Sequence, residues 1–464
     1  MTDWRPDLTR SNAPRYLALA DQIEQDIAAG RLKAGDRLPA QRRLAAQLGL
    51  DFTTVARGYT EAQRRGVISS QVGSGTFVSE TYQPAPNRAA TSSSRHPCPA
   101  DTSMNLPPEP DDPALKSKMR DCLTALSADL IPLMRYQTFD GCEPALEAAI
   151  TWLQRSGLTA DPERIQIAPG AQAALAAILS GLTQPGDMIA CERITYPGLR
   201  SLGAQMGLKL IGLPMDADGI EPDALETACQ TNELKALYLN PTLQNPTTRT
   251  VPLGRRQALV EIAARYNIPI LEDDPYSPLL PVAPLPFAAL APQNTWYIGS
   301  LSKSLGAGLR IAYVQAPNKK AAWQMSRALR ASHVMPPPLM VALASQWVLD
   351  GTAAEICSTI AVESAERQKL AAKRLQSRDY LANSNGFHLW LALKNSWTRA
   401  AFASQVRGLG LGITESDAFT VQGTPAEAVR LCLGGPVSRS TLDSALESIA
   451  NLLETSPEQA SAYF

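Results

Sequence analysis

The first 79 residues carry apolar positions at helical spacing in three consecutive stretches. The first stretch ends at Gly30, a common residue type at helix C-termini, and its apolar positions are Leu17, Ala20, Ile23 and Ile27. A second, shorter stretch follows Pro39 and ends at Gly49. A third runs from about Phe52 to Arg65, and Asp51 is placed to cap its first turn. The pattern predicts three helices.

A β-hairpin is predicted directly after the third helix. Two short segments, Val67-Ile68 and Thr76-Phe77-Val78, flank Gly73-Ser74-Gly75. Three helices and a hairpin are typical of a winged helix-turn-helix, whose third helix lies in the major groove of DNA with its N-terminal residues toward base edges. The candidate base-reading residues are therefore Thr53, Thr54 and Arg57.

Residues 114–464 alternate helical patterns with short apolar runs, which is typical of an α/β fold with a mostly parallel sheet. The candidate strands are Ile165-Gln166-Ile167, Met188-Ile189-Ala190, Ala236-Leu237-Tyr238-Leu239, Ile268-Pro269-Ile270-Leu271 and Trp296-Tyr297-Ile298. Ligands of such sheets bind beyond the carboxyl ends of the strands. We therefore look for the functional residues of this region at those strand ends.

The two patterned regions are separated by a stretch of different composition. From Glu80 to Pro113 the chain has eight prolines, the run Ser92-Ser93-Ser94 and hardly a large apolar residue, as expected for an extended tether. The predicted organisation is a DNA-binding domain over residues 1–79, a Pro/Ser-rich linker over 80–113 and a large domain over 114–464.

The composition excludes global disorder and allows a large core. Of 464 residues, 45% are hydrophobic and 19% are charged. The chain has no apolar run long enough to span a membrane and no signal-peptide pattern, so we expect it in the cytoplasm. Its seven cysteines are scattered and are expected to be reduced core residues. The three histidines show no metal-ligand spacing, so we expect no metal site.

Charge is unevenly divided along the chain. Residues 1–79 hold 11 Lys and Arg against 8 Asp and Glu, out of 43 and 44 in the whole chain, so this segment is +3 and the remainder is −4. The excess of basic residues is sharpest between Gly30 and Gly66, which indicates an anion-binding face. The alternative is a helical bundle that serves only oligomerisation and whose basic residues are simply solvated.

The first domain resembles a known family. The stretch 35–45 (Gly-Asp-Arg-Leu-Pro-Ala-Gln-Arg-Arg-Leu-Ala), the following Thr53-Thr54-Val55 and the segment 73–78 (Gly-Ser-Gly-Thr-Phe-Val) closely resemble the GntR-type DNA-binding domain. In many relatives an Arg stands where this chain has Phe52, so one base contact of the family differs here. The resemblance and the basic pattern together assign contacts with a double-stranded DNA operator to Arg42, Arg43, Thr53, Thr54, Arg57 and the wing at Gly73.

Two predicted strand ends carry residues suited to a charged heteroaromatic ligand. Gly170-Ala171-Gln172 follows the first strand and opens a helix, whose backbone N–H groups and dipole favour an anion such as phosphate. Glu272-Asp273-Asp274-Pro275-Tyr276 ends a buried strand, where a carboxylate can pair with a protonated ring nitrogen and a phenol can reach an oxygen. Helix capping is the alternative role of these carboxylates.

A third strand end carries a lysine among hydroxyl groups. Ser300-Leu301-Ser302-Lys303 ends a strand, and a lysine in such a cleft is suited to forming a Schiff base with an aldehyde. Seven residues later Arg310, expected to begin the next strand, can neutralise a phosphate. Taken singly, this lysine and this arginine could equally be a solvated charge and a member of a surface ion pair.

Together these residues resemble the fold-type I aminotransferases, which use pyridoxal 5'-phosphate. The resemblance implies that Lys303 carries the cofactor as a Schiff base and that Asp273 pairs with its pyridinium nitrogen. Asn245 and Tyr276 would contact the phenolic oxygen, and Tyr196 would stack on the ring. The residues that would hold the phosphate are Ala171, Gln172, Ser300, Ser302 and Arg310.

The same resemblance implies contacts beyond the cofactor. Arg430 matches an arginine that binds a substrate carboxylate, and Tyr136 matches a tyrosine that reaches the phosphate in the partner subunit. Taken alone, Arg430 could be an exposed strand residue. Two positions depart from the family pattern: Thr248 stands where Gly is usual after Asn-Pro-Thr, and Glu147 where relatives often have Arg.

The order of the domains resembles the MocR subfamily of bacterial transcription regulators along the whole chain. This implies a homodimer, often head-to-tail with exchanged DNA-binding domains, that senses an amino compound when the compound displaces Lys303 and forms an external aldimine. Arg430 favours an effector with an acid group. Two other functions remain open: a working aminotransferase with a DNA-tethering module, and a DNA-binding protein whose large domain is an empty scaffold.

Overall fold

The computed structural model describes residues 4–6, 15–28, 30–64, 67–71, 75–79, 104–376, 378–394, 396–407, 409 and 411–457. The chain divides into two compact units, Met1–Pro99 and Ala100–Phe464, which we describe separately. Within the described ranges, no helix combines the length and the apolar character that a membrane span requires.

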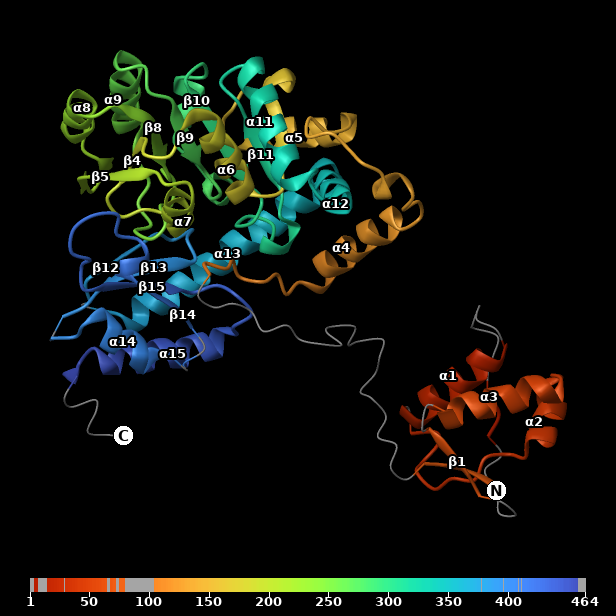
Figure 1. The fold of residues 1–464 in the computed structure, drawn as a ribbon. Coiled ribbons are helices and arrows are strands. Elements are labelled where there is room, and N and C mark those ends of the chain that lie inside the picture. Colours follow the sequence, from red (N-terminus) through yellow and green to blue (C-terminus); the bar gives the residue numbers. More distant parts are fainter. Residues whose placement is uncertain are drawn as a thin grey trace. The chain divides into compact units, whose positions relative to one another are not determined.

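The first unit contains the predicted three helices and hairpin (Figure 1). Its elements are α1 (Arg15–Ala28), α2 (Gln41–Leu48), α3 (Phe52–Arg64), β1 (Ile68–Gln71) and β2 (Gly75–Val78). The strands β1 and β2 pair antiparallel. Asp51 accepts a hydrogen bond from the backbone N–H of Thr53 at 2.7 Å, which confirms the predicted cap of α3.

Close contact between α1 and α3 holds this unit together. Leu19 and Ile23 of α1 are fully buried with Val55 of α3 in a shared core. Gly58 permits this approach, because a Cβ at that position would lie 2.8 Å from Leu19 Cδ2. The Tyr59 hydroxyl also donates to the Pro39 carbonyl at 2.7 Å, which ties α3 to the segment before α2.

A mostly parallel sheet of seven strands forms the centre of the second unit (Figure 1). Its strand order is β3-β11-β10-β9-β8-β4-β5, and β11 is antiparallel to both its neighbours. The strands are β3 (Ile165–Ala168), β4 (Met188–Glu192), β5 (Lys209–Leu213), β8 (Leu234–Leu239), β9 (Ile270–Asp273), β10 (Thr295–Ser300) and β11 (Ala312–Gln315). All five predicted runs lie in or overlap strands, which confirms the fold class. Pro269 precedes its strand, because proline has no N–H to donate to a central ladder.

Helices cover both faces of this sheet, as a parallel sheet requires. Alternate strand residues pack on different helices: Trp296 and Ile298 share a core with α6, α7 and α11, whereas Tyr297 shares one with α5 and α12. A third core lies under α8, α9 and α10. The helices are α5 (Glu143–Arg155), α6 (Ala171–Leu182), α7 (Pro197–Gln205), α8 (Pro222–Thr231), α9 (Leu253–Arg265), α10 (Phe287–Leu290), α11 (Lys319–His333) and α12 (Pro338–Leu349).

A second, antiparallel sheet with the order β12-β13-β15-β14 forms a smaller lobe of the same unit. Its core is made with three helices, and α13 is the longest of them (Figure 1). The elements are β12 (Tyr380–Ala382), β13 (His388–Ala392), β14 (Gly412–Glu415), β15 (Ala428–Cys432), α13 (Thr352–Arg374), α14 (Arg399–Val406) and α15 (Arg439–Leu452). The unit also contains α4 (Pro113–Leu126), the small hairpin of β6 (Met215–Asp216) and β7 (Gly219–Ile220), and several short 3-10 helices.

The segment just before α4 packs against this unit, although its composition resembles that of the tether. Asn105 is only 3% exposed. The Pro107 carbonyl accepts a hydrogen bond from Gly435 N–H at 3.0 Å, and Pro108 forms a parallel bridge with Gly435. A Cβ at Gly434 would lie 1.8 Å from the Leu106 carbonyl oxygen, so the chain can pass here only beside glycine.

A buried ion pair fixes the end of β9. Arg256 of α9 and Glu272 are both fully buried, and Arg256 Nη1 lies 3.2 Å from Glu272 Oε1. Arg256 also donates to the backbone carbonyl of Val251 at 2.9 Å. The backbone N–H groups of Phe287 and Ala288 donate to the two oxygens of Glu272, so the pair is well satisfied.

We predict that Arg256→Met lowers the free energy of unfolding by about 3–5 kcal/mol, because it leaves the Glu272 carboxylate buried without its cation. The matched control is Arg265→Met on the same helix, whose partner Glu226 lies at the surface; its cost is about 1 kcal/mol or less. Urea unfolding followed by tryptophan fluorescence compares the two variants. Equal losses for both would contradict the prediction.

Candidate functional site

The predicted strand-end residues do meet at one edge of the seven-stranded sheet. Asp273 is the last residue of β9, and Lys303 follows β10 by three residues. Asn240 follows β8 and joins the neighbouring strand end, because its Nδ2 donates to the Asp273 carbonyl at 2.7 Å. The backbone N–H of Asn245 in turn donates to Asn240 Oδ1 at 2.8 Å. The loop after β8 is thus held against the end of β9.

Asp273 presents one unused acceptor to the site. Its Oδ2 accepts a hydrogen bond from the Tyr238 hydroxyl at 2.8 Å. Its Oδ1 is buried and has no hydrogen-bond partner among the described residues. Burial raises the pKa of this carboxyl to about 6, against the opposing effects of Tyr238 and the positive charge of Lys303. A buried acceptor of this kind favours a ligand that brings a donor.

Lys303 has an amine suited to attack an aldehyde. Burial, followed by the positive charge of Arg430, lowers the pKa of Lys303 to about 8. The neutral, nucleophilic amine is therefore more populated near neutral pH than it is for an exposed lysine. Its Nζ donates a hydrogen bond to the backbone carbonyl of Asn105.

An anion site lies where β3 passes into α6. Gly170 adopts a positive φ of 94°, and a Cβ there would lie 2.9 Å from Arg310 Nη2, so the guanidinium sits against the start of α6. Ala171 and Gln172 form the first turn of α6, as predicted. The prediction that Arg310 begins a strand is wrong: it has a left-handed conformation, and β11 starts two residues later, at Ala312.

The serines and the tyrosine predicted for this site lie around it as well. Ser300 and Ser302 are buried, and Ser302 N–H donates to Ser300 Oγ at 3.3 Å. The ring of Tyr196 lies over Gly198, where a Cβ would come within 2.2 Å of it. Gln172 Nε2 donates to the Gly198 carbonyl at 3.0 Å, while its Oε1 is buried with no hydrogen-bond partner in the described structure.

Arg430 enters the site from the smaller lobe. It lies in β15 and is 3% exposed, which excludes the alternative of an exposed strand residue. Its Nη1 donates to Asn245 Oδ1 at 3.0 Å, and its Nη2 donates to Thr414 Oγ1 at 3.0 Å. The guanidinium lies 5.2 Å from the centre of the Phe419 ring. A fixed, buried guanidinium is suited to bind a carboxylate.

Sequence reasoning missed Asn105 and His388, which lie beside the predicted residue Tyr276. Asn105 Nδ2 donates to the Tyr276 hydroxyl at 2.9 Å and lies 3.1 Å from His388 Nδ1. His388 Nε2 lies 3.3 Å from the Gln244 carbonyl. Burial, aided by Arg430, lowers the pKa of His388 to about 3, so this ring is neutral. Asn105 carries no sequence signal, because it lies in a proline-rich stretch.

The two departures from the family pattern have different structural settings. Thr248 is buried and has a φ of 61°, a conformation that glycine adopts more easily, which accounts for the usual glycine. Glu147 is an exposed residue of α5. Tyr136 is 84% exposed, so its side chain extends away from this chain.

In the first unit, the predicted DNA-contacting residues lie on the α2 and α3 helices. Arg42, Arg43, Thr53 and Arg57 are exposed, and Thr54 is partly buried. The Arg42 guanidinium of α2 lies 5.9 Å from the centre of the Phe52 ring at the start of α3, so the two side chains are close together. Gly73 lies outside the described residues.

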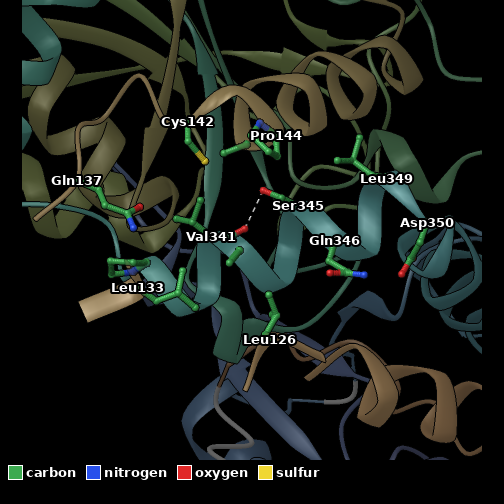
Figure 2. Close-up of a pocket in the computed structure, with 13 residues that line it drawn as sticks. Leu126, Leu133, Gln137, Cys142, Pro144, Val341, Ser345, Gln346, Leu349 and Asp350 are labelled. Carbon is green, nitrogen blue, oxygen red and sulfur yellow. Dashed lines mark hydrogen bonds between the residues drawn. The ribbon is translucent and has the colours of Figure 1, made fainter. Parts of the chain in front are cut away.

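A separate hollow of about 510 Å³ lies between α4, α5 and α12 (Figure 2). Its lining is mainly apolar and includes Leu126, Leu133, Val341 and Leu349. None of the predicted site residues lines it. In the described part of the chain, no group of three His, Cys, Asp or Glu side chains is arranged to hold a metal ion.

The residues at the strand ends fit pyridoxal 5'-phosphate. The buried, unused Asp273 Oδ1 can accept from the protonated ring nitrogen, and the depressed pKa of Lys303 suits its amine to the aldehyde. The start of α6 with Arg310 provides a phosphate site of the required charge. The ring nitrogen, the aldehyde and the phosphate of the cofactor therefore each have a group in this chain that fits them.

Comparison with known proteins gives the same two domains. Residues 105–449 match the family model "Aminotransferase class I and II", and residues 15–78 match "Bacterial regulatory proteins, gntR family". The chain is 30% identical over 453 residues to the uncharacterized HTH-type transcriptional regulator YdeF of Bacillus subtilis, with 97% of each chain covered. It is 28% identical over 435 residues to the vitamin B6 salvage pathway transcriptional repressor PtsJ of Salmonella typhimurium, covering 93% of this chain and 95% of that one.

Among solved structures, the chain resembles Pyrococcus horikoshii kynurenine aminotransferase with a TM-score of 0.69 and 22% identity, over 76% of this chain and 90% of that one. This likeness shows the fold of the large domain. The matches cover both domains in the same order, and class I and II aminotransferases use pyridoxal 5'-phosphate. The chain therefore belongs to the MocR subfamily of bacterial transcription regulators, in which a gntR-family DNA-binding domain precedes an aminotransferase domain.

Proposed function

We propose that this regulator senses a primary amine bearing an acid group, at a pyridoxal 5'-phosphate site centred on Lys303, and changes its affinity for an operator in response. The observation that carries the proposal is the placement in one site of a partly buried lysine with a lowered pKa, a buried carboxylate oxygen without a partner among the described residues, and a buried arginine. These groups are suited in turn to an aldehyde, a ring nitrogen and an effector carboxylate.

Each part of the cofactor has a proposed partner in this chain. Asp273 accepts from the ring nitrogen, and its ionised form is then stabilised by the proton that the nitrogen carries. Asn245 and Tyr276 face the phenolic oxygen, and Tyr196 stacks on the ring. The phosphate is held by Ala171, Gln172, Ser300, Ser302 and Arg310.

The effector binds through its amine and its acid group. When bound, the cofactor would supply an aldehyde that could form a C=N bond with the amine of an effector in exchange for the one with Lys303. Arg430 holds the acid group of the effector in place of its present contact with Asn245. The effector shifts the equilibrium between two states of the protein only by its differential affinity for them.

The DNA-binding unit reads the operator with α3. Thr53, Thr54 and Arg57 face base edges, whereas Arg42 and Arg43 neutralise phosphates, as does the backbone of the wing at Gly73. The net charge of +3 over residues 1–79 supports this role. Such a regulator acts in the cytoplasm, where the DNA is.

We also propose that the protein works as a homodimer, with head-to-tail exchange of the DNA-binding domains. The segment around Tyr136 supports a dimer, because it exposes a group of large apolar side chains: Leu130, Ile131, Met134 and Tyr136 itself. In the dimer, Tyr136 reaches the phosphate in the partner subunit. Two DNA-binding domains also suit an operator with repeated half-sites.

A working aminotransferase is the second candidate function. It is favoured by the complete set of groups around Lys303, which includes the acid, amine and phosphate-binding residues that transamination needs. Incubation with amino acids and 2-oxo acids, with turnover compared with that of a dedicated enzyme, distinguishes the two functions.

Lys303→Ala should abolish the yellow, borohydride-reducible adduct of the protein with pyridoxal 5'-phosphate, because no other group holds the aldehyde. Mass spectrometry of the reduced, digested protein locates the adduct. The control is Lys369→Ala, which removes an exposed lysine of α13 and should leave the adduct intact. An adduct at a different lysine would refute the assignment.

Arg42→Ala should weaken binding to all DNA sequences and lower the slope of log K against log salt by about 1, since it removes one phosphate contact. Thr54→Ala should instead act mainly on the preferred operator. Thr60→Ala, at an exposed position of the same helix, serves as the control. Fluorescence anisotropy at several salt concentrations measures all three. The assignment fails if removal of residues 1–79 leaves operator binding intact.

Arg430→Ala should weaken the response to an acidic primary amine while the cofactor remains bound. Coupling free energies are typically about 1–3 kcal/mol, so the wild-type change in operator affinity is expected to be roughly 5- to 150-fold. Operator titrations with and without a panel of amines measure it, and absorbance reports the cofactor. Loss of the cofactor from the variant would instead identify Arg430 as a structural residue.

A further inference from the structure

Lys303 contacts a segment that lies, in the sequence, on the side of the large unit nearest the DNA-binding unit. Asn105 belongs to this segment and precedes α4 by eight residues. Its backbone carbonyl accepts the hydrogen bond from Lys303 Nζ. The reactive amine therefore touches the connecting segment itself.

The side chain of Asn105 fastens this contact to both lobes of the large unit. Its Nδ2 donates to Tyr276, which follows β9 of the large sheet, and lies beside His388, the first residue of β13 in the smaller lobe. Its Oδ1 is buried and has no partner among the described residues. An unused buried acceptor beside a reactive amine is costly unless a donor reaches it in another state of the site.

The residues after Asn105 pack closely against the chain from Cys432 to Gly435, and we call segment 105–108 seated when these contacts are formed. Gly435 N–H donates to the Pro107 carbonyl, and Cys432 Sγ lies 3.5 Å from the Leu106 carbonyl. The absence of a side chain at Gly434 is what admits the Leu106 carbonyl. Asn105, Pro107 and Pro108 are buried in these contacts, so segment 105–108 is ordered by its packing on the large unit.

We propose that Asn105 is a positioning residue that detects whether the Lys303 amine is free, and that segment 105–108 carries this signal from the effector site toward the DNA-binding unit. The inference rests on the proposed function. When an effector amine takes the place of Lys303 on the cofactor, one C=N bond forms as another breaks, and no oxidant is needed. The lysine leaves as an amine that can donate to the Asn105 carbonyl, so the segment is seated.

In the absence of effector, Lys303 is bonded to the cofactor and this donor is withdrawn. The segment then keeps its contacts with Tyr276, His388, Cys432 and Gly435 but loses the one with Lys303. The seated and released states differ in a hydrogen bond that the effector controls. This gives the effector the differential affinity that coupling requires.

The test uses the full-length protein loaded with pyridoxal 5'-phosphate, an operator fragment and the acidic amine that gives the largest wild-type response. Asn105→Ala is expected to reduce the ratio of operator affinities with and without amine to within about twofold of one, from the roughly 5- to 150-fold of the wild type. Asn105→Asp, which replaces the Nδ2 donor with an oxygen that can accept from the Tyr276 hydroxyl, should restore part of the ratio. Met104→Ala, at the exposed neighbouring position, is the control and should respond like the wild type.

Hydrogen exchange of the unsubstituted protein provides a second measurement. The amine should increase the protection of the Gly435 amide, which donates to the Pro107 carbonyl when the segment is seated. An unchanged amine response in Asn105→Ala, or unchanged protection at Gly435, would overturn the inference.

The possible failures are distinguishable. If the wild-type protein shows no amine-dependent change in operator affinity, the proposed sensing function fails and this inference fails with it. If the wild type responds and Asn105→Ala responds equally, only the role of Asn105 fails. If Asn105→Ala no longer forms the reducible adduct, Asn105 belongs to the cofactor site and is not a detector, which also overturns the inference.

Discussion

Three consecutive carboxylates at the end of one buried strand impose the main constraint on this protein. Glu272, Asp273 and Asp274 are all buried, and each needs its own compensating partners. Glu272 has Arg256 and two backbone N–H groups, and Asp274 accepts from the backbone N–H of Ser277 at 3.0 Å. Asp273 alone keeps one oxygen unused. The helices and loops at this edge of the sheet are arranged around those needs.

Glu272 and Asp274 are therefore satisfied by partners within the protein, whereas Asp273 has an oxygen available to a ligand. The pKa of Asp273 is raised to about 6 from an ordinary 3.8, so the folded protein without cofactor binds the proton more tightly than the unfolded chain does. The contribution of this group to stability therefore falls as pH rises from about 4 to 6 and stays lost above that. In the proposed site a protonated ring nitrogen beside Asp273 would supply the missing partner and remove the penalty. On that proposal, cofactor binding would be linked to folding through this carboxylate.

Local chemistry explains which features could be predicted from the sequence. The three helices with their glycine ends, the strand runs, and the positions of Lys303 and Asp273 follow from periodicity and from residue types at strand ends. The sequence predicts a strand at Arg310, because nothing in the residue type signals the left-handed conformation that this arginine adopts. Asn105 and His388 are 283 positions apart in the chain and meet only through tertiary packing. Proline-rich composition around Asn105 concealed the fact that the segment is buried.

The contacts of residues 105–108 with the large unit determine where a fragment containing the large domain must begin. A fragment that began at α4, where the composition changes, would lack the carbonyl that accepts from Lys303 and the amide that holds Tyr276. It would also leave an open channel beside Gly434, whose missing side chain is matched to that segment. The proline-rich stretch and the aminotransferase domain thus share residues, because the end of that stretch contacts Lys303.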